Sequence, residues 1–123
     1  FSQALGIQYG VDPAPRFLKL SRDRGIVPIQ AKAEDLPFKR GSLEQVYLIF
    51  SICFLEDPLR ALHGIRSVLK KGGLLIIGFV PKDSEWGVLY GQKKKEGHHL
   101  YRHASLFHLK DLLSDIEKMH FQI

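Results

Sequence analysis

Short apolar runs alternate along the chain with longer stretches in which apolar residues recur at helical spacing. Apolar runs bounded by turn-forming residues predict strands, and runs without polar alternation predict strands that are buried on both faces. The predicted strands are residues 7–11, 27–30, 45–52 and 74–80, with another beginning at Phe121. Pro28 predicts an edge position for the second strand because proline cannot donate a backbone hydrogen bond.

Helices are predicted where apolar residues recur every three or four positions between capping residues. Asp57 followed by Pro58 predicts the start of a helix over residues 59–69, which Gly72 and Gly73 would end. The other predicted helices are residues 15–24, followed by Gly25; residues 84–96, capped by Asp83 or Ser84; and residues 109–119. Strands that alternate with helices predict an α/β domain with a parallel sheet, and 123 residues suffice for one domain, residues 1–123.

Composition and cysteine content narrow the class of protein. The chain is 45% hydrophobic and 25% charged, which is typical of a globular domain and argues against disorder. No apolar run approaches the roughly 20 residues that span a bilayer. The single cysteine, Cys53, has no partner for an internal disulfide, which favours a reducing compartment and predicts a cytoplasmic protein. The chain starts at Phe1 rather than Met and ends like the start of a strand, so we expect a piece of a larger domain.

A modest excess of positive charge says little about partners. Lysine and arginine outnumber aspartate and glutamate by 18 to 13, which gives a net charge of +5. The densest runs are Lys93 to Lys95 and Lys70–Lys71, and neither is interleaved with aromatic residues as in a groove for single-stranded nucleic acid. We interpret them as solvated surface lysines and do not expect nucleic acid as a partner.

In open parallel sheets, ligands bind beyond the carboxyl ends of the strands. Asp12 stands at the end of the first predicted strand, directly before a helix. A carboxylate in that place can accept hydrogen bonds from both hydroxyls of a nucleotide ribose. It can equally well cap the following helix, and spacing alone does not separate the two roles.

Three segments resemble the class I S-adenosylmethionine-dependent methyltransferases, in the small-molecule branch that includes quinone-biosynthesis enzymes. They are Gly-Val-Asp-Pro-Ala-Pro at 10–15, Ala-Glu-Asp-Leu-Pro-Phe at 33–38 and Ser-Val-Leu-Lys-Lys-Gly-Gly-Leu-Leu-Ile-Ile at 67–77. The resemblance implies a Rossmann-like parallel sheet with helices on both faces. It also implies that the family's first strand and glycine-rich loop lie upstream of Phe1.

The resemblance assigns S-adenosylmethionine as the cofactor and methyl transfer to a small molecule, by in-line displacement, as the activity. It implies that Asp12 binds the ribose, that Pro13, Ala33 and Glu34 border the adenine, and that Ile49 and Phe50 present backbone to the methionine end. Lys32 departs from the pattern, since the family often has an aspartate there that reaches the adenine amino group. No catalytic residue is assigned, because a general base is needed only if the acceptor is protonated.

Trp86, Tyr90 and Tyr101 follow the fourth predicted strand, where this family binds the acceptor. They are candidates for an apolar or cation-binding wall. For Trp86, packing into the core under the helix at 84–96 is slightly favoured over that role. For Tyr90 and Tyr101 the choice stays open.

The remaining candidates for chemistry are weaker. Cys53 fits a buried small apolar residue better than a nucleophile, because no histidine is paired with it in the sequence. His98, His99 and His103 favour a surface or pocket role over a metal site, because the glutamate of a zinc-protease helix is absent.

Two alternatives to a methyltransferase remain. An NAD-type dehydrogenase shares the strand, acid and helix arrangement but does not explain the segment at 33–38. A degenerate, non-catalytic Rossmann-like module would act as a scaffold or bind nucleic acid through its basic surface. The sequence does not predict the oligomeric state.

Overall fold

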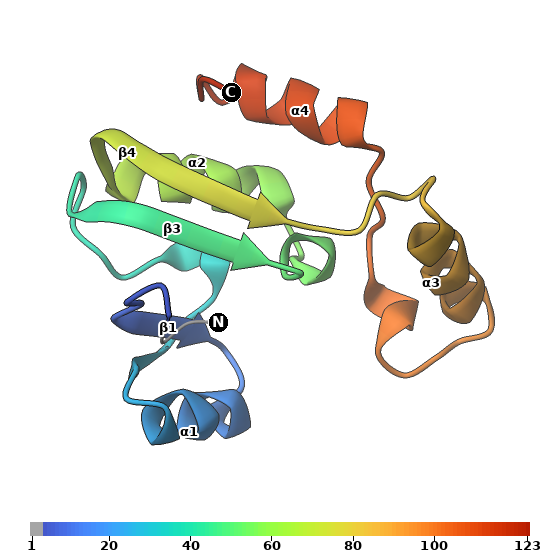
Figure 1. Ribbon diagram of the computed structural model, residues 1–123, viewed down its shortest axis with the longest axis horizontal. Coiled ribbons are helices and arrows are strands. Elements are labelled where there is room, and N and C mark those ends of the chain that lie inside the picture. The colour runs from blue at the N-terminus through green and yellow to red at the C-terminus, as the bar shows by residue number, and fades with distance from the viewer. Residues whose placement is uncertain (1–3) are drawn as a thin grey trace.

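The computed structural model describes residues 4–123, which form four strands, four helices and three short 3₁₀ turns (Figure 1). The strands are β1 (Tyr9–Asp12), β2 (Val27–Gln30), β3 (Leu43–Ile49) and β4 (Leu69–Gly78). The helices are α1 (Pro15–Asp23), α2 (Pro58–Val68), α3 (Glu85–Lys95) and α4 (Leu109–Lys118). The 3₁₀ turns are Ala33–Asp35, Ile52–Phe54 and Tyr101–His103.

All strand pairs are parallel, which confirms the predicted α/β class. Within residues 4–123 the strands form two pairs, β1 with β2 and β3 with β4, rather than one continuous sheet. The arrowheads of β3 and β4 point toward α3 and the 3₁₀ turn Tyr101–His103 (Figure 1). The carboxyl ends of this pair therefore face the segment that contains the aromatic candidates.

Local capping fixes the starts of two helices where the sequence predicts them. The Asp57 carboxylate accepts a hydrogen bond from the backbone N–H of Arg60 at 3.0 Å, ahead of Pro58 at the first position of α2. Ser84, rather than Asp83, caps α3, because its Oγ accepts from the Gly87 N–H at 3.0 Å. Gly25 follows α1 with a φ of 75°, a conformation that glycine adopts without strain.

The core lies between α2 and the β3–β4 pair. Leu48 of β3, Ile65 of α2 and Leu69 form its buried cluster, and Phe121 packs against them. The prediction that these strands are buried on both faces is wrong for the described chain: in β3 only Leu48 is buried, and Leu74 of β4 is 56% exposed.

Two predicted element ends are also wrong. The strand predicted over 45–52 stops at Ile49, because Phe50 adopts a left-handed φ of 55° that cannot continue a strand. Ile52 is fully buried, but in a 3₁₀ turn. Helix α2 ends at Val68, one residue before the predicted end at Leu69, because Leu69 already pairs with Leu43 at the start of β4. Gly72 and Gly73 lie within β4 and do not end the helix.

The predicted strand at the end of the chain is absent from the described residues. Residues 121–123 follow α4 without entering either strand pair, and Phe121 contributes to the core instead. Strand β4 likewise ends at Gly78, two residues before the predicted end at Val80.

Candidate functional site

At the carboxyl ends of the strands, hydrogen bonds join each strand end or following segment to that of the next strand along the chain. At the ends of β1 and β2, the side-chain amide of Gln30, the last residue of β2, donates to the Pro13 carbonyl at 3.3 Å. Glu34, in the segment after β2, accepts a hydrogen bond from the backbone N–H of Glu56, in the segment after β3. Ser105, in the chain after β4, donates its backbone N–H to the carbonyl of Cys53, in the segment after β3, at 2.6 Å. The structure thus links the carboxyl ends of the strands, where a parallel sheet binds its ligands.

Asp12 ends β1 and is half-buried. Its Oδ1 accepts a hydrogen bond from the Ala14 N–H at 2.7 Å, which closes the turn before α1. Ala14, the N-cap residue of α1, supplies no side-chain cap of its own. Within residues 4–123 the other carboxylate oxygen, Oδ2, has no recorded hydrogen bond. The helix-start role is therefore present, and one oxygen is left for the hydroxyls of a ligand.

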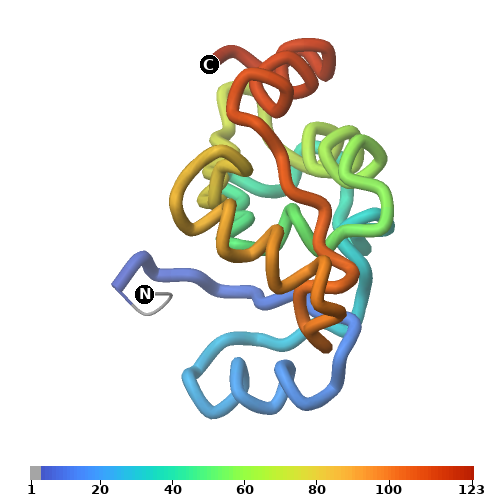
Figure 2. The backbone as a smooth tube through the Cα atoms, turned by 90° about the vertical axis from the view of Figure 1, so that its right-hand side faces the viewer, coloured from blue at the N-terminus to red at the C-terminus, as the bar shows by residue number. Residues whose placement is uncertain are grey.

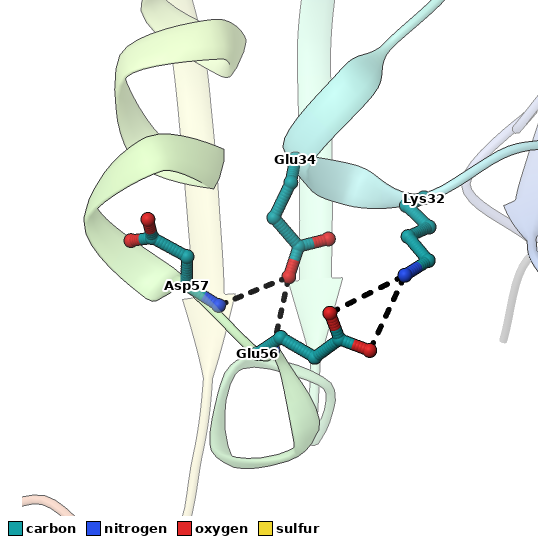
Figure 3. Close-up of polar contacts among 4 residues, drawn as sticks. All are labelled: Lys32, Glu34, Glu56 and Asp57. Atoms are coloured by element: carbon teal, nitrogen blue, oxygen red, sulfur yellow. Dashed lines mark hydrogen bonds and ion pairs between the residues drawn. The ribbon is translucent and has the colours of Figure 1, made fainter.

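The 3₁₀ turn Ala33–Asp35 is bound to the start of α2 through Glu34 (Figure 3). Its Oε1 accepts from the backbone N–H groups of Glu56, at 2.9 Å, and Asp57, at 3.2 Å. Lys32 pairs with the Glu56 carboxylate, with Nζ 3.2 and 3.3 Å from its two oxygens. The Glu34 side chain thus has a structural task that the sequence does not reveal, because the two amides lie 22 and 23 residues further along the chain.

Replacing Glu34 by alanine is expected to lower the free energy of unfolding by about 0.5–1.5 kcal/mol, because the backbone N–H groups of Glu56 and Asp57 lose the acceptor that ties them to the turn. Glu34→Gln keeps an acceptor oxygen and should lose less. Urea denaturation followed by circular dichroism measures both, with Glu117→Ala, an exposed position on α4, as the matched control. Equal losses in Glu34→Ala and Glu117→Ala would contradict the tethering role.

Ile49 and Phe50 occupy the carboxyl end of β3. Ile49 is half-buried beside Gly78, where a Cβ would lie 3.2 Å from the Ile49 side chain. Phe50 combines its left-handed backbone with a side chain that is 60% exposed, while its N–H donates to the Gly78 carbonyl at 2.7 Å. A left-handed aromatic residue costs about 1–3 kcal/mol, and such strain concentrates at ligand-binding sites.

The aromatic candidates lie together. The rings of Tyr90 and Tyr101 stack with centroids 4.5 Å apart, and Trp86 lies 6.0 Å from Tyr90. Trp86 is 62% exposed, so the prediction that it packs into the core is wrong. Phe54, which sequence reasoning missed, lies 6.4 Å from Tyr101 and joins this group from the segment after β3. We call Phe54, Trp86, Tyr90 and Tyr101 the aromatic cluster.

Two ionisable groups at the aromatic cluster are held in their neutral forms. Desolvation raises the pKa of Tyr101, and the hydrogen bond and charge of Tyr90 add to this effect. Burial raises the pKa of the half-buried Cys53 thiol, which donates weakly to the Phe50 carbonyl. At neutral pH both side chains can donate a hydrogen bond, and neither acts as an anionic nucleophile.

Other kinds of site find little support in the described chain. No group of three or more histidine, cysteine, aspartate or glutamate side chains in residues 4–123 is placed to hold a metal ion. None of the described helices has the length and apolar character that a bilayer crossing requires. One open hollow lies at the opposite end of β1 and β2, lined by residues 6–9 and 24–27.

Comparison with known families decides what this arrangement belongs to. The profile of the methyltransferase domain family matches residues 1–77, which include β1 to β3 and most of β4. The chain belongs to this family. Membership implies S-adenosylmethionine as the cofactor and favours a methyltransferase over an NAD-type dehydrogenase.

A solved structure supports the same conclusion over the whole chain. A SAM-dependent methyltransferase from Thermotoga maritima, described as a possible histamine N-methyltransferase, is 36% identical and superposes with a TM-score of 0.94. The match covers 100% of this chain and 59% of the Thermotoga chain. The Rossmann-like methyltransferase fold is thereby confirmed.

Two curated relatives define how far the similarity reaches. The Mycobacterium tuberculosis protein Rv2003c is 34% identical over 118 residues, covering 94% of this chain and 41% of the relative. The quinone-biosynthesis C-methyltransferase UbiE of Idiomarina loihiensis is 37% identical over 60 residues, covering 46% of this chain and 24% of UbiE. The chain thus spans well under two thirds of these relatives, and the assignment to the quinone-biosynthesis branch stays a prediction.

Proposed function

We propose that the protein containing this chain transfers a methyl group from S-adenosylmethionine to a small-molecule acceptor by in-line displacement. The observation that carries the proposal is the match of the whole chain, at 36% identity, to a SAM-dependent methyltransferase. When bound, the cofactor supplies an electrophilic methyl group on a sulfonium. The protein's task is then to hold donor and acceptor in line and to exclude water.

The residues at the strand ends fit the cofactor. Asp12 offers a carboxylate whose Oδ2 is free of hydrogen bonds within residues 4–123 and can accept from the hydroxyls of a ribose. We assign Pro13, Ala33 and Glu34 to the border of the adenine. Because the Glu34 carboxylate is occupied by the Glu56 and Asp57 amides, its contribution there comes from the backbone.

Phe50 and Ile49 are assigned to the methionine end. The exposed ring and left-handed backbone of Phe50 both raise the free energy of the unliganded chain. Contact with a ligand would offset part of that cost. Lys32, paired with Glu56, leaves the adenine amino group without a carboxylate from that position.

Asp12→Asn is the variant that tests the site. The asparagine Oδ1 can still accept from Ala14, whereas its amide nitrogen cannot accept from a ribose hydroxyl. We expect the Kd for S-adenosylhomocysteine, measured by calorimetry, to rise about tenfold or more, because a bond to a charged group is lost.

Asp23→Asn, an exposed position at the end of α1, is the matched control and should leave the Kd unchanged. Two results would refute the proposal: a folded wild-type protein that does not bind S-adenosylhomocysteine, or one that binds NADH more tightly. The first result would favour the non-catalytic module, and the second would favour the dehydrogenase.

A further inference from the structure

The segment after β4 carries an excess of cations beside the aromatic cluster. Residues 93–103 include Lys93, Lys94, Lys95 and Arg102, together with three histidines, against a single acid, Glu96. In the described residues none of these four cations forms an ion pair. Four other basic residues each pair with a carboxylate: Lys32, Arg60, Lys70 and Lys118.

The unpaired cations adjoin the carboxyl ends of β3 and β4. The 3₁₀ turn Tyr101–His103 is held to the segment after β3 by the Ser105–Cys53 hydrogen bond and by the contact of Phe54 with Tyr101. Helix α3 and this turn lie side by side, in gold and orange in Figure 2. The positive charge therefore lies beside the carboxyl ends of β3 and β4, where a parallel sheet binds its ligands, and not on a remote surface.

Lys94 Nζ donates a hydrogen bond to the Ala104 carbonyl at 2.6 Å and Arg102 Nε donates to His103 Nε2 at 3.1 Å, whereas Lys93 lies against the aromatic cluster. Its Nζ lies 5.5 Å from the ring centroid of Tyr101, whose ring also stacks on Tyr90. Its side chain is half-buried, whereas Lys94, Lys95 and Arg102 are exposed. An ammonium group with no carboxylate beside it attracts an anion that reaches it.

The aromatic cluster adds a flat surface to this charge. The 62% exposed Trp86 ring lies beside Tyr90 and can stack on a planar group. A ring that carries a negative charge would use both features, whereas a cationic amine would meet repulsion from Lys93 and its neighbours.

From this juxtaposition we propose that the acceptor is an anionic ring compound, whose carboxylate or phosphate binds Lys93 while its ring lies against Trp86 and Tyr90. The inference rests on the proposed function for the methyl donor. It concerns only the recognition of the acceptor, and can be measured separately from the donor.

The test uses Trp86, the single tryptophan of the chain, as a fluorescent reporter at this surface. Four probes of similar size are titrated in phosphate-free buffer, each with and without saturating S-adenosylhomocysteine: benzoate, phenyl phosphate, benzyl alcohol and benzylamine. We expect one or both anions to bind at least tenfold more tightly than benzyl alcohol, and benzylamine to bind most weakly. Benzoate and phenyl phosphate distinguish a carboxylate from a phosphate.

Lys93→Gln should weaken binding of the preferred anion about tenfold and leave benzyl alcohol unchanged. Lys71→Gln is the matched control and should change neither, because Lys71 is an exposed lysine of β4 with no ion pair in the described chain. In the wild type, raising the salt concentration should weaken binding of the anion but not of benzyl alcohol, because salt screens exposed charges.

Three results would overturn the inference: equal affinity for the anions and benzyl alcohol, tighter binding of benzylamine, or equal effects of Lys93→Gln and Lys71→Gln. Calorimetry with S-adenosylhomocysteine keeps the two proposals apart. Normal binding of that ligand without selection by charge refutes only the anionic acceptor. Selection by charge without binding of that ligand refutes the methyltransferase, and the surface would then bind anionic ring compounds without being a methyl-acceptor site.

Discussion

Ile65→Ala is expected to lower the free energy of unfolding by about 2–5 kcal/mol, because it removes three carbons from a core that cannot collapse to fill the space. Ile65 of α2 is 1% exposed and contacts Leu48 and Leu69, which brings the helix onto both strands of the β3–β4 pair. Domains of this size are stable by only about 5–15 kcal/mol, so the loss is a large share of the total.

Urea denaturation monitored by circular dichroism measures this effect through the midpoint at constant slope. Leu59→Ala is the control on the same helix, since Leu59 is 44% exposed and leaves little cavity. We expect a loss below about 1 kcal/mol there. If both variants unfold at the same urea concentration, the assignment of the core to this face of α2 is wrong.

Where local chemistry decides the structure, the sequence predicts it well. The starts of α2 and α3 depend on Asp57 and Ser84, whose side chains bond to N–H groups three residues away. The turn after α1 depends on Gly25, whose φ of 75° few other residues adopt without strain. These contacts lie within one turn of chain, so a short window of sequence contains all the information.

Where contacts between distant segments determine the structure, an apolar pattern indicates that a residue is buried but not which backbone conformation it adopts. Ile52 extends the apolar run after β3 because it is buried, although the backbone has already turned at Phe50. Phe121 is apolar because it packs on the buried cluster of the core, not because it belongs to a strand. Both errors come from reading one hydrophobic residue as evidence for a particular secondary structure.

In the candidate site, too, features that depend on neighbouring residues can be predicted from the sequence, and contacts between distant segments cannot. Asp12 can be found from sequence because its place at a strand end is local, and Trp86 and Tyr90 meet because they are four residues apart on a helix. The contact of Phe54 with Tyr101 joins segments that follow different strands. The isolation of Lys93 from carboxylates likewise depends on the fold, since a sequence shows which charges exist but not which of them pair.

Gly87→Ala is expected to displace the start of α3, with a loss of local stability of about 3 kcal/mol or more. A Cβ on Gly87 would lie 2.0 Å from the Pro81 carbonyl oxygen and 2.6 Å from that of Lys82. Both obstacles are backbone atoms, and Ser84 binds this segment by donating to the Pro81 carbonyl while accepting from Gly87. The clash can be relieved only if the helix start moves and the cap is strained, and overpacking of this kind commonly costs 1–3 kcal/mol or more.

Gly91→Ala on the same helix separates this clash from helix propensity. Its Cβ would lie 3.6 Å from the nearest side-chain atom, of Leu106, which is an ordinary contact. Alanine there should stabilise α3 by about 0.5–1 kcal/mol, so the two glycine substitutions are expected to act in opposite directions. Amide hydrogen exchange over residues 85–95 measures both, and Trp86 emission reports the position of the helix start.

The effect of Gly87→Ala on binding depends on which site residues move when the start of α3 is displaced. Helix α3 carries Trp86, Tyr90 and Lys93, whereas Asp12 and Glu34 lie on segments that precede it by more than 45 positions and bind other partners. Gly87→Ala should therefore abolish discrimination between benzoate and benzyl alcohol while changing the Kd for S-adenosylhomocysteine less than about threefold, a shift below 1 kcal/mol. Parallel loss of both affinities would mean that α3 supports the donor site as well, and that donor and acceptor recognition form one cooperative unit in this domain.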